Sequence, residues 1–141
     1  MQKAKLLRAS TIALSLDVLL RGQLKYLNEH LDVTAVSGPD EHLNAVQGRE
    51  GVRILPLRFE RQISPFKDLV SLIKLYFLLR REKPDIIHSI TPKAGLLSML
   101  AGKAAGVPIR MHTFTGLVFP TRTGAMQKIL IAMDRLLCWA A

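Results

Sequence analysis

Cysteine is almost missing from this sequence, since Cys138 is the only one among 141 residues. A single cysteine excludes an internal disulfide framework and a metal site made of several cysteines, and it fits a reducing compartment such as the cytoplasm. No run of about 18 or more apolar residues occurs either, so we expect no segment that spans a bilayer. The apolar stretch near the N-terminus is interrupted by Arg8 and Asp17, and we interpret it as part of the folded domain and not as a signal peptide.

Acidic and aromatic residues are also scarce. Only 11 Asp and Glu residues stand against 20 Lys and Arg residues, which gives a formal net charge of +9, and aromatic residues make up 6% of the chain. A basic surface attracts phosphates, anionic lipids or nucleic acids. The few aromatic residues are not interleaved with lysine and arginine, as they are in surfaces that stack on bases. We therefore expect a phosphorylated substrate or an anionic membrane surface as the partner, and no nucleic acid.

The sequence lacks the common motifs for bound cofactors. It contains no G-x-G-x-x-G and no Walker A pattern, which argues against a dinucleotide or ATP site. No group of His, Cys, Asp and Glu residues has the spacing of metal ligands, and no Ser-His-Asp set can be argued. We expect no cofactor, no metal and no covalent nucleophile.

Short apolar runs alternate with longer helical patterns along the chain, which is typical of β-α-β units that form a parallel sheet. The length and the 49% share of hydrophobic residues suit a single folded domain. We predict an α/β fold, a Rossmann-like parallel sheet of about five strands with helices on both faces. The predicted strands are residues 6–14, 33–37, 52–57, 85–90 and 109–114.

The first three predicted helical segments differ in how much apolar surface they carry. Residues 15–31 form one amphipathic helix with Ser15 as its N-cap, and residues 38–51 form a short helix or a loop that holds little core. Residues 66–81 are apolar almost all round. Their narrow polar stripe consists of Lys67, Ser71, Lys74 and Arg81. We expect a second apolar surface, from a partner domain or a membrane, to cover this third segment.

The helix after the fourth strand has the clearest boundaries. Thr91 can cap it, Pro92 fits its first position, and Gly106 fits its end. The last helix, from residue 124 on, has an apolar stripe and reaches the end of the chain without a cap. We expect from this ending that the chain is one part of a longer protein.

Ligands of such a sheet bind at the carboxyl ends of the strands, so the polar residues after the first, fourth and fifth strands are the candidate site residues. After the fourth strand, Lys93 adds positive charge to the start of a helix, which suits an anion. An equal alternative is that Lys93 extends into solvent while Thr91 only caps the helix. His88 lies inside the strand, where a histidine is more often a core residue than a catalyst.

The fifth strand leads into a cluster of hydroxyl, imidazole and glycine groups. His112, Thr113, Thr115 and Gly116 lie at its end, and Arg122 follows on a loop. This cluster suits hydrogen bonding to a sugar. The alternative is a simple Thr-rich exit turn, and we prefer the functional interpretation because two strand ends show the same chemistry.

The segment HSITPKAGLLSMLAGKAAGVPIRMHTFTG, residues 88–116, resembles the fourth strand, helix and fifth strand of bacterial family 4 glycosyltransferases. The resemblance is strongest to those that add sugars to lipid-linked precursors of capsule, O-antigen or glycoprotein glycans. The segments SLDVLLRGQLKYL and KPDIIHSITPKAG are similar in kind and in order, so the resemblance covers most of the chain.

The resemblance implies a GT-B architecture, in which two Rossmann-like domains face each other across a cleft. Residues 1–141 would be the N-terminal, acceptor-binding domain. The C-terminal domain, which in the family binds the nucleotide-sugar and carries an E-x7-E pattern, is expected to be absent from this chain, and the chain alone is expected to be inactive. The family transfers sugars with retention of configuration, usually without a metal, by stabilising the departing nucleotide diphosphate with fixed positive groups.

The resemblance also assigns candidate residues. The loop from Ser10 to Ser15 would lie by the donor phosphate and the acceptor, and Thr115 stands where many relatives carry a histidine that faces the reacting sugar. His112 should point to the opposite face of the strand from Thr115. The catalytic candidates are His88, His112 and Thr115. The substrate-binding candidates are Ser10, Thr11, Ser15, Thr91, Lys93, Thr113, Gly116 and Arg122.

The leading hypothesis is the acceptor domain of a retaining hexosyltransferase that uses a nucleotide-sugar and a lipid-linked or polysaccharide-precursor acceptor. It would contact its own C-terminal domain and work at the cytoplasmic face of the plasma membrane. The alternative is a non-catalytic Rossmann-like module that binds an anionic membrane surface or a protein partner. Nucleic-acid binding is a third possibility, which predicts a steep salt dependence of the affinity.

Overall fold

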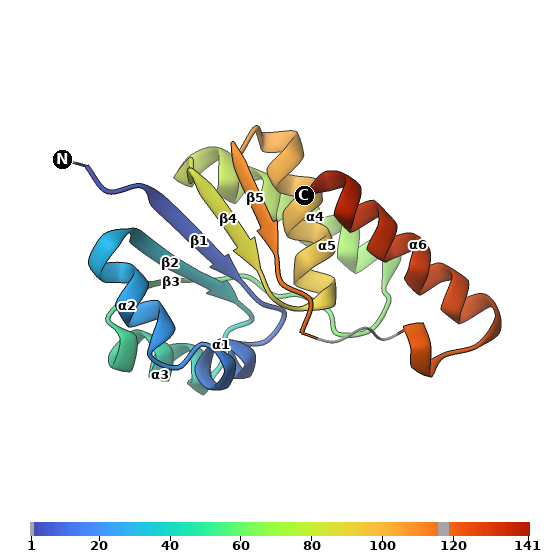
Figure 1. Cartoon of the computed structure of the whole chain (residues 1–141), viewed down its shortest axis with the longest axis horizontal. Helices are drawn as coiled ribbons and strands as arrows, with labels where there is room; N and C mark the ends of the chain where they lie inside the picture. Colours follow the sequence, from blue (N-terminus) through green and yellow to red (C-terminus); the bar gives the residue numbers. More distant parts are fainter. Residues whose placement is uncertain (1, 116–118) are drawn as a thin grey trace.

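Five parallel strands form one sheet in the computed structural model, which describes residues 2–115 and 119–141 (Figure 1). The strands are β1 (Lys5–Ala9), β2 (Asp32–Ser37), β3 (Arg53–Pro56), β4 (Ile86–Ser89) and β5 (Ile109–His112). The predicted α/β class with a five-stranded parallel sheet is confirmed. Strand β1 ends at Ala9 and not at residue 14, because a helix already begins at Ala13.

The strand order in the sheet is β3-β2-β1-β4-β5, with β1 in the centre. The chain therefore winds from β1 towards one edge of the sheet, crosses back to β4 and continues to β5 at the other edge. The carboxyl ends of β1 and β4 lie side by side where the direction of winding reverses. Open α/β sheets bind their ligands at this position.

Helices cover both faces of the sheet (Figure 1). Helices α1 (Ala13–Leu19), α2 (Gln23–His30) and α3 (Glu41–Glu50) pack on one face. Helices α4 (Pro65–Glu82), α5 (Pro92–Ala105) and α6 (Gly124–Ala140) pack on the other, and a short 3-10 turn, η1 (Phe119–Thr121), precedes α6. Each face has its own hydrophobic cluster, with Leu16 buried in the first and Met99 in the second.

The prediction of one helix over residues 15–31 is wrong, because the chain forms two helices there. Gly22 breaks the helix with φ of 79°, a conformation that glycine adopts at little cost. Its N–H donates to the Glu50 carboxylate at 2.5 Å, and Glu50 is buried. Ser15 lies inside α1 and is not the N-cap, which is Ile12. The side chain of Glu50 in α3 thus binds the residue at which the second helix starts.

Residues 41–50 are helical, so of the two alternatives for this segment the helix is correct. Asp40 is the N-cap and accepts from Leu43 N at 3.2 Å, and Gly51 ends the helix with φ of 68°. The expectation that this segment holds little core is wrong, since Leu43 and Val46 are buried in the cluster of the first face.

Helix α4 packs one side against the core and leaves the other side exposed. Leu75 and Leu79 are buried. Ser71, which was expected in the polar stripe, is also buried. Its hydroxyl donates to the Arg58 carbonyl at 3.0 Å, so the prediction that Ser71 belongs to an exposed stripe is wrong. Four large apolar side chains are exposed at a spacing that places them along one side of the helix. We call Phe66, Leu69, Ile73 and Phe77 the α4 row.

The predicted boundaries of α5 and α6 agree with the structure. Pro92 occupies the first turn of α5, and Gly106 ends the helix with φ of 78°. Helix α6 begins at Gly124 and runs to Ala140. Within the described residues, no helix is both long and apolar enough to cross a membrane.

Candidate functional site

Two threonines meet at the point where the winding of the sheet reverses. The Thr91 hydroxyl oxygen accepts from Thr11 N at 2.7 Å and lies 2.7 Å from the Thr11 hydroxyl oxygen. The Thr11 hydroxyl oxygen accepts from Ala94 N at 3.1 Å. The expected cap of α5 therefore comes from Thr11 and not from the side chain of Thr91. These bonds connect the loop after β1 to the start of α5, and both hydroxyls already have protein partners.

The other hydroxyls of the β1 loop serve the turn itself. Ser10 is buried, and its hydroxyl donates to the Ile12 carbonyl at 2.9 Å. Ser15 is half-buried in the first turns of α1. Their roles in substrate binding stay predictions.

Lys93 does not extend into solvent, so that alternative is wrong. Its side chain is buried, and Nζ donates to both carboxylate oxygens of Asp68, at 2.8 and 2.7 Å, and to the Gln62 carbonyl at 2.8 Å. An ammonium group has three N–H donors, so all of them are engaged. The pair joins α5 to α4. Anion binding by Lys93 stays a prediction, and an anion would have to displace one of these partners.

His112 and Thr115 line the same hollow, which lies between β5 and α6 and also contains Ile90 and Met133. The expectation that they point to opposite faces is wrong, because β5 ends at His112 and strand alternation no longer applies to Thr115. The hollow measures about 40 Å³. This is roughly the room of one water molecule, and a sugar ring does not fit.

The ring of His112, which lines this hollow, contacts Ser89 and Gly95. Its Nδ1 lies 2.8 Å from the Ser89 hydroxyl, and its ring fills the space above Gly95, where a β-carbon would overlap it. Burial lowers the pKa of His112, so the ring is neutral at neutral pH. The Thr115 hydroxyl donates to the Ile90 carbonyl at 3.3 Å.

His88 has both ring nitrogens engaged, which agrees with the interpretation of a satisfied histidine. Nδ1 lies 2.9 Å from Nη1 of Arg8, and Nε2 lies 2.8 Å from the Thr113 hydroxyl. Burial, and secondarily the Arg8 charge, lower the pKa of His88 to about 4. Of the remaining candidates, Arg122 is exposed on the segment before α6, and Gly116 lies outside the described residues.

A larger hollow lies at the carboxyl ends of β1, β2 and β3, and the sequence analysis missed it. It measures about 520 Å³ and is lined by Thr11, Gly38 and the segment from Arg58 to Gln62, among others. Three exposed basic side chains, Arg58, Arg61 and Lys67, border it, and none forms an ion pair with a described residue. Asp40 and Glu60 also border it. We call this space the basic hollow. The signal in the sequence was the basic segment directly after the third strand.

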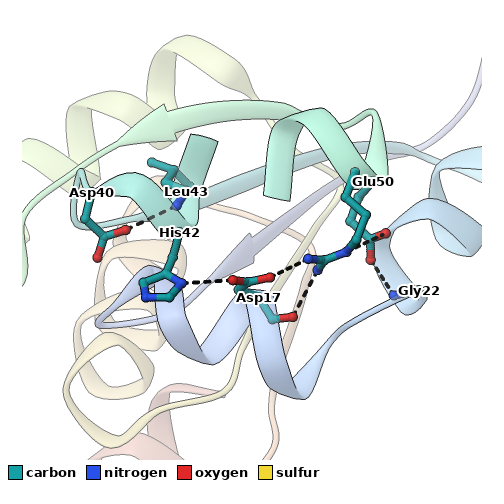
Figure 2. A network of polar contacts seen from close by, with 7 residues as sticks. Asp17, Gly22, Asp40, His42, Leu43 and Glu50 are labelled. Carbon is teal, nitrogen blue, oxygen red and sulfur yellow. Dashed lines mark hydrogen bonds and ion pairs between the residues drawn. The ribbon is translucent and has the colours of Figure 1, made fainter. Parts of the chain in front are cut away.

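A separate network of charges joins α1 to α3 (Figure 2). The Asp17 carboxylate accepts from His42 Nδ1 at 2.9 Å and from the Arg49 guanidinium, which also donates to the Asp17 carbonyl at 2.9 Å. The bonds from Arg49 and then His42 lower the pKa of Asp17, and Asp17 raises the pKa of His42. Each charge here faces an opposite one, so the network connects α1 to α3. Within residues 2–115 and 119–141, no three His, Cys, Asp or Glu side chains are grouped as metal ligands.

The comparisons with known proteins identify the family. The glycosyl transferase 4-like family matches residues 12–139. The chain is 34% identical to the capsular polysaccharide biosynthesis glycosyltransferase CapM of Staphylococcus aureus over 142 residues, which are 100% of this chain and 36% of CapM. It is 49% identical over 70 residues, 50% of this chain, to the UDP-Gal:alpha-D-GlcNAc-diphosphoundecaprenol alpha-1,3-galactosyltransferase of Escherichia coli, of which it covers 18%.

The solved structures support the fold. A UDP-N-acetylglucosamine 2-epimerase matches 100% of this chain and 39% of its own, with a TM-score of 0.69 at 20% identity. At this identity the likeness shows the shared fold alone. The chain thus spans 36% and 18% of the two glycosyltransferases that it matches. Because the family match extends over nearly all of its residues, the chain belongs to the glycosyl transferase 4-like family.

Proposed function

We propose that this chain is the acceptor-binding domain of a retaining glycosyltransferase that moves a sugar from a nucleotide-sugar to a lipid-linked or polysaccharide-precursor acceptor. The observation that carries the proposal is the basic hollow at the carboxyl ends of β1, β2 and β3. The names of the two glycosyltransferase relatives, one for capsular polysaccharide and one for a diphosphoundecaprenol acceptor, support this substrate class.

The chemistry of the basic hollow suits a diphosphate. Arg58, Arg61 and Lys67 bring three positive charges to its border, against the carboxylates of Asp40 and Glu60. The Asp40 carboxylate is already hydrogen-bonded to Leu43 N, where it caps α3. Arginine binds phosphate oxygens with paired N–H donors, which gives strong and oriented contacts. The role proposed for these three residues is to hold the diphosphate of the acceptor and so to orient the sugar that it carries.

The proposed reaction needs a second domain. A nucleotide-sugar is the donor substrate, and its binding site would belong to a C-terminal domain that faces this one across a cleft. Fixed positive groups would stabilise the departing nucleotide diphosphate without a metal ion. We therefore expect no sugar transfer by residues 1–141 alone, and transfer that persists in EDTA when both domains are present.

The α4 row supports a position at the membrane surface. Phe66 and Phe77 are 79% and 64% exposed, and Leu69 and Ile73 continue the row between them. Lys67, Lys74 and Arg81, all exposed, follow at intervals of seven along one side of it. An apolar strip with basic side chains beside it suits an anionic bilayer, where each basic residue contributes about 1 kcal/mol. Lys67 also borders the basic hollow, so a membrane at α4 would lie next to the acceptor site.

Acceptor binding by the 141-residue chain tests the proposed function. We expect the chain to bind a detergent-solubilised polyprenyl diphosphate N-acetylhexosamine, and the Arg58→Ala, Arg61→Ala double variant to bind it roughly tenfold or more weakly, because two charged contacts are removed. The matched control removes the same charge elsewhere, by Arg21→Ala and Lys25→Ala at exposed positions around α2. Equal affinity of all three proteins would contradict the proposal and would favour the non-catalytic module.

Vesicle binding tests the membrane surface separately. On vesicles that contain phosphatidylglycerol, Phe66→Ser with Phe77→Ser should release most of the protein in a sedimentation assay. Val18→Ser with Tyr26→Ser removes two exposed apolar side chains from the opposite face of the sheet and should leave binding unchanged. If both double variants bind as the unchanged protein does, the α4 row does not contact the bilayer.

A further inference from the structure

A row of three polar side chains runs from the centre of the sheet to its β5 edge. Arg8 of β1 and His88 of β4 are register partners, and the Thr113 amide continues the ladder beyond β5 by donating to the Ser89 carbonyl. The side chains follow the same order. Arg8 Nη1 lies 2.9 Å from His88 Nδ1, and His88 Nε2 lies 2.8 Å from the Thr113 hydroxyl oxygen. The row thus connects a buried arginine to an exposed hydroxyl at a strand end.

The direction of every hydrogen bond in the row follows from the first one. A guanidinium can only donate, so His88 Nδ1 must accept from Arg8. In a neutral imidazole the proton is then on Nε2, which must donate to the Thr113 oxygen. Since that oxygen already accepts from His88, the hydroxyl proton of Thr113 remains to be donated outward. Donors that point the same way along a row also polarise one another.

The charge of Arg8 has no acidic partner within the described residues. The side chain is 3% exposed, its Nε is buried without a hydrogen-bond partner, and no described carboxylate forms an ion pair with it. Burial alone lowers the pKa of Arg8 to about 10, so it remains charged at neutral pH. Buried charges are normally paired, because an isolated one is expensive to remove from water. A negatively charged substrate bound near the row would reduce the free-energy cost of burying the Arg8 charge.

We infer that Arg8 and His88 are positioning residues that fix the Thr113 hydroxyl as a hydrogen-bond donor to a phosphate oxygen of a substrate. The inference rests on the proposed function, since it deepens the same strand-end site by adding an anion contact at the β5 edge. Thr113 is the group that touches the phosphate. Arg8 acts through His88, by selecting its tautomer and by adding positive charge behind it. The phosphate comes either from the lipid-linked acceptor or from the nucleotide-sugar.

Nuclear magnetic resonance on the 141-residue chain tests the positioning role directly. Nitrogen-15 shifts of His88 should show a neutral ring that carries its proton on Nε2 at pH 7. Arg8→Met keeps the volume of the side chain and removes the donor, so it should shift His88 towards a mixture of tautomers and raise its pKa above about 4. Asp68→Ala with Lys93→Met removes another buried cation together with its counter-ion, on the face of the sheet that carries α4 and α5, and should leave the His88 signals unchanged. An unchanged His88 in Arg8→Met would overturn the role of Arg8.

Phosphate titration tests the contact itself. With methyl phosphate as the probe, the Thr113 amide should shift saturably, and Thr113→Val should weaken binding roughly tenfold, the effect expected for one hydrogen bond to a charged group. Thr113 is exposed, so this variant should fold even if Arg8→Met does not. Thr123→Val, at an exposed position before α6, is the matched control and should bind as the unchanged chain does. Equal affinities of Thr113→Val and the control would overturn the inference.

Two further ligands identify the source of the phosphate. These ligands are measured on protein that carries both domains, because the nucleotide-sugar site is proposed to lie in the second one. If the acceptor supplies the phosphate, Thr113→Val weakens binding of the polyprenyl diphosphate saccharide and not of UDP, and if the donor supplies it, the reverse holds. Failure of the inference is distinguishable from failure of the proposed function. Acceptor binding that is equally tight in Thr113→Val and the unchanged chain, with UDP also unaffected, removes only the inference. Methyl phosphate binding at Thr113 without acceptor binding removes only the proposed function.

Discussion

Lys93 and Arg8 are both buried cations near the carboxyl ends of the strands, yet they differ in what surrounds them. Lys93 is 6% exposed and has all three N–H donors on Asp68 and Gln62. Arg8 is 3% exposed and has one neutral histidine as its only described partner. The paired charge of Lys93 joins α5 to α4, whereas the charge of Arg8 has no acidic partner among the described residues. Burial by itself therefore does not show whether a charge is neutralised inside the protein.

The largest expected effect on stability is at the Lys93 pair. Asp68→Ala leaves a buried ammonium without its counter-ion and should lower the free energy of unfolding by about 3 kcal/mol or more, measured by urea denaturation. The double variant Asp68→Ala, Lys93→Met removes both charges and should recover most of the loss. If the double variant is no more stable than the single one, the charge of Lys93 is not what Asp68 compensates.

The free energy of unfolding should fall at acid pH because of His88. Its pKa is lowered from 6.5 to about 4 in the folded state, so the unfolded chain binds the proton more readily as the pH falls through this window. Stability that is fully present above pH 6.5 is therefore lost towards pH 4, by an amount on the order of 1 kcal/mol after allowance for the half-exposed ring. Urea denaturation at several pH values should show a smaller acid loss for His88→Gln. His30→Gln, at an exposed position, is the control. If His88→Gln loses as much stability in acid as His30→Gln does, the lowered pKa of His88 is contradicted.

The smallest expected change in stability is at Arg8. Arg8→Met removes an unpaired charge, so the gain from avoided desolvation offsets the lost bond to His88, and the net change should be about 1 kcal/mol or less. Urea denaturation of Arg8→Met and Asp68→Ala compares the changes in the free energy of unfolding of the two variants. A loss at Arg8 as large as that at Asp68 would mean that the protein itself depends on the Arg8 charge, and the contrast between the two cations would disappear.

Most of the fold was predictable because it depends on local periodicity. The alternation of apolar runs and helical patterns gave five parallel strands, and the positions of Pro92 and Gly106 gave the limits of α5. The two-helix break at Gly22 was not predictable in this way. A glycine inside an amphipathic pattern is compatible with a continuous helix, and the Glu50 carboxylate that takes its N–H lies 28 residues away.

The candidate site was predicted only at the level of the sheet edge. The strand ends were correctly expected to gather polar groups, and Thr11 and Thr91 do meet there. The contacts of each side chain could not be predicted from the sequence pattern. The Lys93 ammonium finds Asp68 on a different helix, and Arg58 and Arg61 border the basic hollow although no motif marks them.

The sequence by itself determined the class of the fold, the order of its elements, the basic charge and the resemblance to a glycosyltransferase family, because these depend on residue types and on spacing along the chain. The tertiary structure alone decided which cations are paired with a carboxylate and where the basic hollow forms at the strand ends. Those outcomes depend on distances between residues such as Lys93 and Asp68, which are 25 positions apart, and the packing of helices on the sheet sets these distances.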